Sequence, residues 1–233
     1  MLAKISFQKV IAVIISVIIL IAFIFGIVTR ESYLFSSQDK SKISTAELQL
    51  SEDFSSEYNN IYSSVDFDTA LSELEQSKYI FYAKCIKSEI CYDCIKHTMR
   101  VIKTIKGDAE ETSKEIVLYQ LLCFDFHNQK IMFVSPDNTL PLKEGKEYLI
   151  FANKRDYYDD YQKRLNKNEY SLCLSGCFPT SLIVNETQNE YVNVSQAKNY
   201  SDVENLYYMC YNKTSLNNVN NISQKLINHF LDN

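Results

Sequence analysis

The sequence predicts a mainly β protein, in which a closed or partly closed antiparallel barrel with short flanking helices follows one N-terminal transmembrane helix. Three observations predict this fold class. An apolar run occupies residues 10–28, short alternating runs of strand type recur along the following chain, and no long helical pattern separates those runs. The chain has 233 residues, enough for one domain of ordinary size, and its 46% hydrophobic content excludes a wholly disordered chain.

The apolar run at residues 10–28 predicts a membrane anchor. Only Ser16 and Gly26 in this run lie outside the aliphatic and aromatic residues. As a helix the run would extend about 28 Å, close to the ~30 Å hydrocarbon core of a bilayer. No small-x-small cleavage site follows, so we interpret the run as an uncleaved signal anchor, with cleavage near residues 36–37 as the alternative. Lys4 and Lys9 place the stub at residues 1–9 in the cytoplasm.

The chain beyond the anchor is predicted to lie outside the cytoplasm and to form three regions. A polar tether is expected at residues 29–65, the barrel at 66–185, and an Asn-rich extension with two short helices at 186–233. The whole chain has a formal net charge of -5, and residues 31–233 carry 21 basic and 29 acidic side chains. This acidic balance argues against a nucleic-acid partner and against anionic partners in general.

The strands are predicted from the alternation of apolar and polar residues. One face of the run at residues 78–87 holds Tyr79, Phe81, Ala83 and Cys85. Similar runs occur at residues 97–105, 115–124, 131–134, 147–153, 169–174 and 180–184. Gly107 is expected to supply a positive φ at the turn after the second run. Helices are expected at residues 66–77, near 201–210 and at 219–231.

Two segments of the barrel region resemble a known group of domains. Residues 101–107 read Val-Ile-Lys-Thr-Ile-Lys-Gly, and residues 142–151 read Leu-Lys-Glu-Gly-Lys-Glu-Tyr-Leu-Ile-Phe. Their order resembles exported bacterial domains with the OB-like barrel of tissue inhibitors of metalloproteinases and netrin modules. The resemblance covers about residues 67–185 and implies a five-stranded OB-like antiparallel β-barrel that binds a partner without a catalytic residue. It also implies a tight turn at Gly145 and a barrel filled by Tyr148, Leu149 and Phe151.

The inhibitory mechanism of those proteinase inhibitors does not transfer to this chain. In the inhibitors a free N-terminal cysteine binds the zinc of the protease. Here the first cysteine is Cys85, and the N-terminus is tied to the predicted membrane helix. The resemblance therefore implies a fold and a binding role rather than a target.

Seven cysteines all follow the predicted anchor, and they are interpreted first as a disulfide framework of an exported domain. They are Cys85, Cys91, Cys94, Cys123, Cys173, Cys177 and Cys210. The odd number leaves one cysteine over, and spacing alone leaves the pairing open. We expect Cys91 and Cys94 in the loop between the first two barrel strands, and Cys173 and Cys177 in a turn that contains Gly176.

Two other interpretations of the cysteines remain open. Cys91-Tyr-Asp-Cys94 would suit a thiol–disulfide protein, although the expected helix N-terminus is missing from the pattern. Cys91, Cys94, Cys173 and Cys177 would suit a structural zinc–thiolate site. No cofactor is expected under the first interpretation.

The function predicted from these features is a membrane-anchored extracytoplasmic binding module without enzymatic activity. Residues 10–28 would contact the lipid bilayer, and the barrel would bind an unknown extracytoplasmic protein or small ligand. His97, His127 and His229 are far apart in the sequence, and no hydrolase, metalloprotease or phosphate-loop motif occurs. The acidic aromatic segment at residues 156–161 is interpreted as a solvated hairpin tip. The alternatives are the thiol–disulfide protein and the zinc domain.

Overall fold

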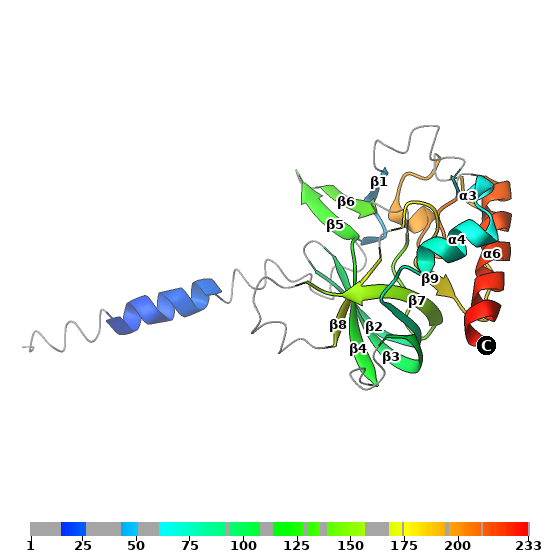
Figure 1. The fold of residues 1–233 in the computed structure, drawn as a ribbon. Coiled ribbons are helices and arrows are strands. Elements are labelled where there is room, and N and C mark those ends of the chain that lie inside the picture. Colours follow the sequence, from blue (N-terminus) through cyan, green and yellow to red (C-terminus); the bar gives the residue numbers. More distant parts are fainter. Residues whose placement is uncertain are drawn as a thin grey trace, which may run out of the picture. The chain divides into compact units, whose positions relative to one another are not determined.

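A computed structural model gives the fold of the chain (Figure 1). It describes residues 15–26, 43–50, 61–91, 94–107, 114–127, 130–135, 139–156, 168–173, 175–193, 196–210 and 212–232. The chain divides into two compact units, residues 1–39 and residues 40–233. In the first unit, residues 15–26 form a helix whose apolar side chains are exposed on all sides.

The predicted anchor extends beyond the described helix at both ends. Within the residues that the structure describes, no helix is both long enough and apolar enough to cross a membrane. The remaining residues of the range 10–28 lie outside the described part of the chain. The membrane anchor therefore stays a prediction.

The second unit is mainly β and contains a closed barrel of five strands (Figure 1). The barrel strands are β2 (Tyr79–Ile90), β3 (Ile95–Lys106), β4 (Glu115–Gln120), β7 (Glu147–Lys154) and β8 (Glu169–Leu172). Their order is β2-β3-β4-β8-β7, and β7 pairs with β2 to close the ring. The short strand β9 (Ser181–Ile183) adds to the first half of β7.

One strand pair corrects the expectation of a fully antiparallel barrel. β4 and β8 are parallel, whereas the other four pairs of the ring are antiparallel. The chain leaves the barrel after β4 and re-enters it at β7, which runs antiparallel to β2. β8 turns back from β7 and therefore runs in the same direction as β4.

A second, three-stranded sheet lies beside the barrel in the order β1-β6-β5. Its strands are β1 (Glu47–Leu50), β5 (Cys123–His127) and β6 (Lys130–Ser135). β1 pairs in parallel with β6, so part of the expected tether at residues 29–65 belongs to the folded unit. The predicted run 115–124 is divided between β4 and β5, because the chain turns out of the barrel at Leu121 and Leu122.

Helices cover one side of the barrel and complete its core (Figure 1). They are α3 (Ile61–Ser64), α4 (Phe67–Leu74) and α6 (Lys213–Leu231). α4 begins after its N-cap Asp66, at the start of the helix predicted for residues 66–77, and the Asp66 side chain accepts a hydrogen bond from the Thr69 amide at 2.8 Å. Phe230 of α6 meets Phe151 of β7 edge to face, with ring centroids 5.5 Å apart. The helix expected near 201–210 is only a 3₁₀ turn, η3 (Tyr200–Asp202).

The residues singled out by the resemblance lie where it implied. Gly145 has a φ of +82° in the turn before β7. Tyr148, Leu149 and Phe151 are all buried in the hydrophobic core. The turn at Gly145 and the three buried side chains agree with the expected positions in the barrel. All four residues stabilise the fold, and their positions give no information on function.

Candidate functional site

The candidate site lies on the outer face of β3, β4 and β8, where an aromatic and a cationic side chain are in contact. Alternation along each strand turns Ile95, Ile116 and Leu118 inward and leaves Lys96, Val117 and Tyr119 half-buried on the outer face. Lys96 of β3 lies opposite Tyr119 of β4, and Tyr119 lies opposite Ser171 of β8. The three strands therefore place Tyr119 at the centre of one cross-strand row.

A cation–aromatic pair forms the centre of this outer face. The Arg155 guanidinium carbon lies 3.7 Å from the centroid of the Tyr119 ring. The strand-end position of Arg155 is fixed because its backbone N–H donates to the Glu169 carbonyl at 3.1 Å. Burial and the neighbouring Glu169 carboxylate raise the pKa of Tyr119 to about 12. The phenol is protonated at neutral pH, and its hydrogen bond goes to the Glu169 carboxylate.

Two strand connections border the Tyr119–Arg155 pair. One is the turn between β2 and β3, in which the Cys91 backbone N–H donates to the Cys94 carbonyl at 2.9 Å. The Cys91 side chain is close enough to influence Tyr119 electrostatically. The other connection joins β7 to β8 directly after Arg155. Its predicted acidic aromatic segment, 156–161, lies outside the described residues except for the exposed Asp156.

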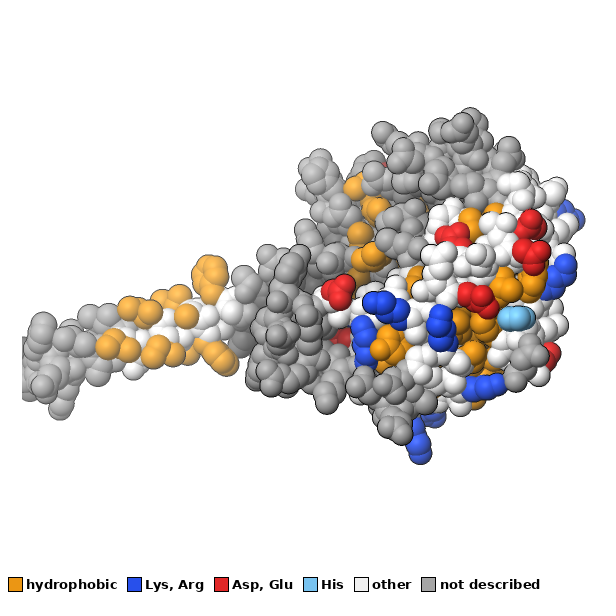
Figure 2. Space-filling view, viewed as in Figure 1, with side chains coloured by type: hydrophobic (Ala, Val, Ile, Leu, Met, Phe, Trp, Pro, Cys, Tyr) orange, Lys and Arg blue, Asp and Glu red, His pale blue; other side chains and the backbone are white. Residues whose placement is uncertain are grey.

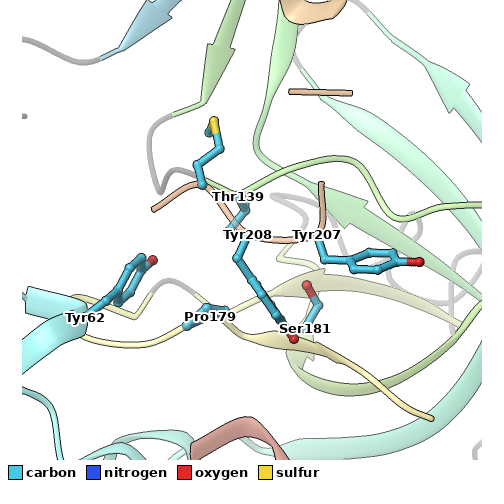
Figure 3. Close-up of a pocket in the computed structure, with 7 residues that line it drawn as sticks. Tyr62, Thr139, Pro179, Ser181, Tyr207 and Tyr208 are labelled. Carbon is cyan, nitrogen blue, oxygen red and sulfur yellow. The ribbon is translucent and has the colours of Figure 1, made fainter. Parts of the chain in front are cut away.

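A tyrosine-lined pocket lies at another part of the barrel, where β9 meets the chain that follows η3 (Figure 3). Figure 3 shows Tyr208 near its centre, with Tyr62 and Tyr207 on opposite sides. The Tyr208 hydroxyl accepts a hydrogen bond from the Ile183 backbone N–H at 3.2 Å. This pocket and its neighbour around Tyr148 each have a cavity volume of about 10 Å³. That is room for about one water molecule, far below typical small-molecule sites of about 300–1,000 Å³.

A buried polar network connects β2, β3 and β4. His97 is 0% exposed, and its Nδ1 lies 2.8 Å from the Ser88 hydroxyl. Its Nε2 lies 3.1 Å from the side-chain oxygen of Gln120. Burial lowers the pKa of His97 to about 4, so the imidazole is neutral at neutral pH.

Ser88, His97 and Gln120 are arranged in the order of a nucleophile, a base and a residue that orients the base. The further contacts of Ser88, however, are those of a residue that stabilises the fold. Ser88 Oγ also lies 3.2 Å from the Leu142 carbonyl, and the Ser88 backbone N–H donates to Glu144 at 2.8 Å. The bond from the Ser88 amide to Glu144 holds the 139–144 segment against the barrel. The scattered histidines of the sequence gave no sign of this network. Alternation could have shown that His97 shares the inward face with Ile95 and Met99.

The predicted disulfide framework is not formed in the structure. All seven cysteines lie within the described part of the chain, and none of them is disulfide-bonded. Cys85 and Cys210 are buried among core side chains of the barrel. Cys123 begins β5 of the second sheet rather than a barrel strand. The predicted places of Cys91 and Cys94 in the β2–β3 turn are correct.

Cys173 and Cys177 lie in the segment between β8 and β9, as expected, and each meets a residue at α4. The Cys177 thiol donates to the Glu73 carboxylate, and burial together with this carboxylate raises the pKa of Cys177 to about 12. The Cys173 thiol forms a hydrogen bond with the Ser77 side chain, and burial raises the pKa of this thiol. Both pKa shifts favour the protonated thiol in the chain without a metal.

The zinc and redox interpretations find no geometric support. Among the described residues, no group of three or more His, Cys, Asp and Glu side chains is arranged to hold a metal ion. The four cysteines of the zinc interpretation are thus not gathered into one site. Cys91 and Cys94 flank a strand-to-strand turn, and Cys94 is buried. A helix N-terminus, the usual device for lowering a thiol pKa, is absent from the described residues of this turn.

Comparison with known proteins assigns the chain to no family. The chain matches no protein-family model and no curated protein.

Proposed function

We propose that this chain is a non-enzymatic, membrane-anchored binding module that recognises an extracytoplasmic protein through the outer face around Tyr119 and Arg155. The single observation that carries the proposal is the Arg155 guanidinium stacked 3.7 Å from the Tyr119 ring centroid on an outward barrel face. Tyrosine and arginine are among the residues that contribute most binding energy at protein interfaces. A half-buried pair that is already stacked loses less conformational entropy on binding than two mobile side chains.

The strand order supports an OB-like assignment of the barrel. β3 and β4 are its second and third strands, and the parallel β4–β8 pair joins the third strand to the fifth. OB-folds bind their ligands on the second and third strands and on the loops after the first and fourth strands. Tyr119 lies on β4 between the corresponding loops. The resemblance to inhibitors of metalloproteinases and netrin modules remains part of this proposal.

The size of the described pockets favours a macromolecular partner. The two tyrosine-lined pockets each have a cavity volume of about 10 Å³, too little to enclose a small organic ligand. The Tyr119 face, by contrast, is presented on the outside of a sheet. Protein partners bind such shallow surfaces through a few central side chains.

The membrane anchor is part of the same proposal. The described helix at residues 15–26 exposes large apolar side chains, with Phe25 68% exposed. A large exposed apolar surface requires a lipid or protein environment. Mass spectrometry of the mature protein tests the anchor: retention of residues 1–30 is expected, whereas a mature N-terminus beyond Arg30 would show that the segment is a cleaved signal peptide.

Site-specific photo-crosslinking in the source cells tests the binding surface. A benzoylphenylalanine at Val117, beside Tyr119 on the outer face, should give a discrete protein adduct. The adduct should disappear when Tyr119→Ala is added. The same probe at the exposed Lys225 on α6 is the matched control and should not give that adduct. An adduct from Val117 that persists in the Tyr119→Ala variant would contradict the proposal.

A further inference from the structure

We propose that a second surface, the outer face of the β2–β3 hairpin, rests on an anionic bilayer through Ile86, Ile102, Lys84 and Lys103. We call these four residues the hairpin face. The inference rests on the proposed anchor only for the proximity of the bilayer. It goes beyond the Tyr119 surface, because it uses different residues on different parts of the strands.

Irregular strand pairing places two isoleucines on the hairpin face. The register of β2 and β3 shifts between Cys85 and Lys87, which leaves Ile86 without a paired residue on β3. It shifts again where Tyr82 and Ala83 pair with Lys103 and Val101, which leaves Ile102 without a partner on β2. Bulges of this kind redirect side chains. Ile86 is 36% exposed and Ile102 is 49% exposed.

Basic side chains occupy the surface between the two isoleucines. Lys84 of β2 lies directly opposite Arg100 of β3, and Lys103 lies opposite Tyr82. Two like charges on opposite strands destabilise a sheet unless an anion compensates them. Figure 2 shows basic side chains beside exposed hydrophobic ones over the barrel.

Within the part of the chain that the structure describes, the acidic side chains around the hairpin face form no ion pair with Lys84 or Lys103. Glu115 of β4 pairs with Arg100 at 3.5 Å. Glu147 of β7 lies opposite Lys84, but its carboxylate accepts the hydrogen bond of the Tyr82 hydroxyl. Among the described residues, neither Lys84 nor Lys103 has a carboxylate within ion-pair distance. The hairpin face is therefore locally cationic although the chain as a whole is acidic.

An anionic bilayer fits this combination better than an acidic protein does. Lysines that flank exposed apolar side chains allow the apolar groups to enter the headgroup region while the ammonium groups meet lipid phosphates. If residues 10–28 span the membrane, the chain from Val28 to Ile43 extends at most about 50 Å. The barrel would then remain close to a bilayer at all times, so a weak contact is sufficient.

Single tryptophans provide the test, because the chain contains none. The full chain is reconstituted in nanodiscs of phosphatidylcholine, with or without about 30% phosphatidylglycerol. Ile102→Trp reports on the hairpin face. Leu121→Trp is the matched control, because Leu121 is equally exposed at 49% and lies where the chain leaves the barrel after β4. Brominated lipid quenches a tryptophan that enters the bilayer.

The expected result is a blue shift and at least about twofold quenching in the Ile102→Trp variant, only in discs that contain phosphatidylglycerol. The response should vanish in about 1 M salt and in the Lys84→Glu/Lys103→Glu double variant. The control variant Leu121→Trp should not respond. Equal emission of the Ile102→Trp variant in both kinds of disc would overturn the proposal, and so would a response that survives the double variant.

Failure of the anchor is distinguishable from failure of this inference. A chain that does not integrate into discs is instead added to preformed vesicles of the same two compositions. A phosphatidylglycerol-dependent response of the Ile102→Trp variant would then support the hairpin face while rejecting the anchor. Silence of this variant on both discs and vesicles, with a protein adduct from a photo-probe at position 102, would assign the face to an acidic protein and reject the bilayer.

Discussion

The His97 imidazole faces the side-chain oxygen of Gln120 at 3.1 Å, with both residues buried between neighbouring barrel strands. The Gln120 amide nitrogen donates to the Thr139 hydroxyl and the Leu140 carbonyl, at 3.2 and 3.0 Å. This fixes the amide oxygen toward His97, so Nε2 carries the imidazole proton. Nδ1 is then the acceptor that faces Ser88.

This geometry predicts that acid destabilises the fold through His97. Burial lowers the pKa of His97 to about 4, whereas an unfolded histidine has its pKa near 6.5. Between these values the unfolded chain binds more protons, so stability is complete above about pH 6.5 and falls as the pH approaches 4. We expect a loss on the order of 3 kcal/mol over this interval, measured by urea unfolding.

A variant separates His97 from other titrating groups. His97→Gln should have a lower stability at pH 7 but a flatter dependence between pH 4.5 and 6.5. An unchanged pH dependence in His97→Gln would show that other groups dominate acid unfolding.

Gly107 should be the least replaceable glycine of the barrel. Its φ is +109°, and an added Cβ would lie 2.3 Å from Cδ1 of Tyr79. The Tyr79 ring is held edge to face against Tyr170 with centroids 5.0 Å apart, so it cannot move aside easily. We expect Gly107→Ala to cost roughly 2–4 kcal/mol in unfolding free energy, measured by chemical denaturation.

Two other glycines are graded controls for this prediction. Gly145 has a φ of +82° but open space around its Cα, so Gly145→Ala should cost only about 1 kcal/mol. Gly176 has neither restriction, and Gly176→Ala should stay within about 0.5 kcal/mol of the wild type. Equal costs at all three positions would contradict the conformational explanation.

Asn212 should stabilise α6 as its N-cap. Its side-chain oxygen accepts a hydrogen bond from the Ser215 backbone N–H at 2.7 Å. Asn212→Ala should therefore lower the unfolding free energy by about 1 kcal/mol, whereas Asn212→Asp should retain the stability. Asn221→Ala, at an exposed position inside the same helix, should be neutral or slightly stabilising. Thermal unfolding of the three variants checks the order.

The cysteines should react according to their burial rather than as disulfide pairs. After unfolding without reductant, alkylation and mass mapping should modify all seven cysteines, since none is disulfide-bonded in the structure. In the folded chain, half-exposed Cys91 should react before buried Cys85 and Cys210. Burial raises the pKa of Cys210 to about 12, which slows its reaction further. A Cys91–Cys94 crosslink that resists mild reduction would contradict this order.

Sequence alternation was sufficient for most of the barrel. Strands with one buried face, such as β2 and β3, show the period of two that defines their inward residues. The Gly107 turn and the helix that begins near residue 66 were also predicted, because each depends on residues next to one another in the chain. Local patterns identify elements whose stabilising contacts are local.

The remaining features depend on contacts between distant segments. β1 has only four residues, and its sequence alone resembles a polar tether. It forms a strand because β6 lies beside it. The parallel β4–β8 pair follows from the path of the whole chain. The Tyr119–Arg155 pair joins two strands that are not consecutive, and His97 is satisfied by residues of two other strands. No spacing in the sequence indicates these partners.

The most direct test of the binding proposal uses the partner protein that the photo-probe at position 117 captures. Its affinity is measured for the wild-type chain and for the Tyr119→Ala variant. We expect its Kd to rise at least about tenfold, the loss of a central aromatic contact. Tyr207→Ala is the matched control, because Tyr207 also has a cation over its ring, Lys143 at 4.3 Å, and a glutamate on its hydroxyl. Its Kd should change less than about twofold. Equal affinities for the wild type and Tyr119→Ala would contradict the central claim.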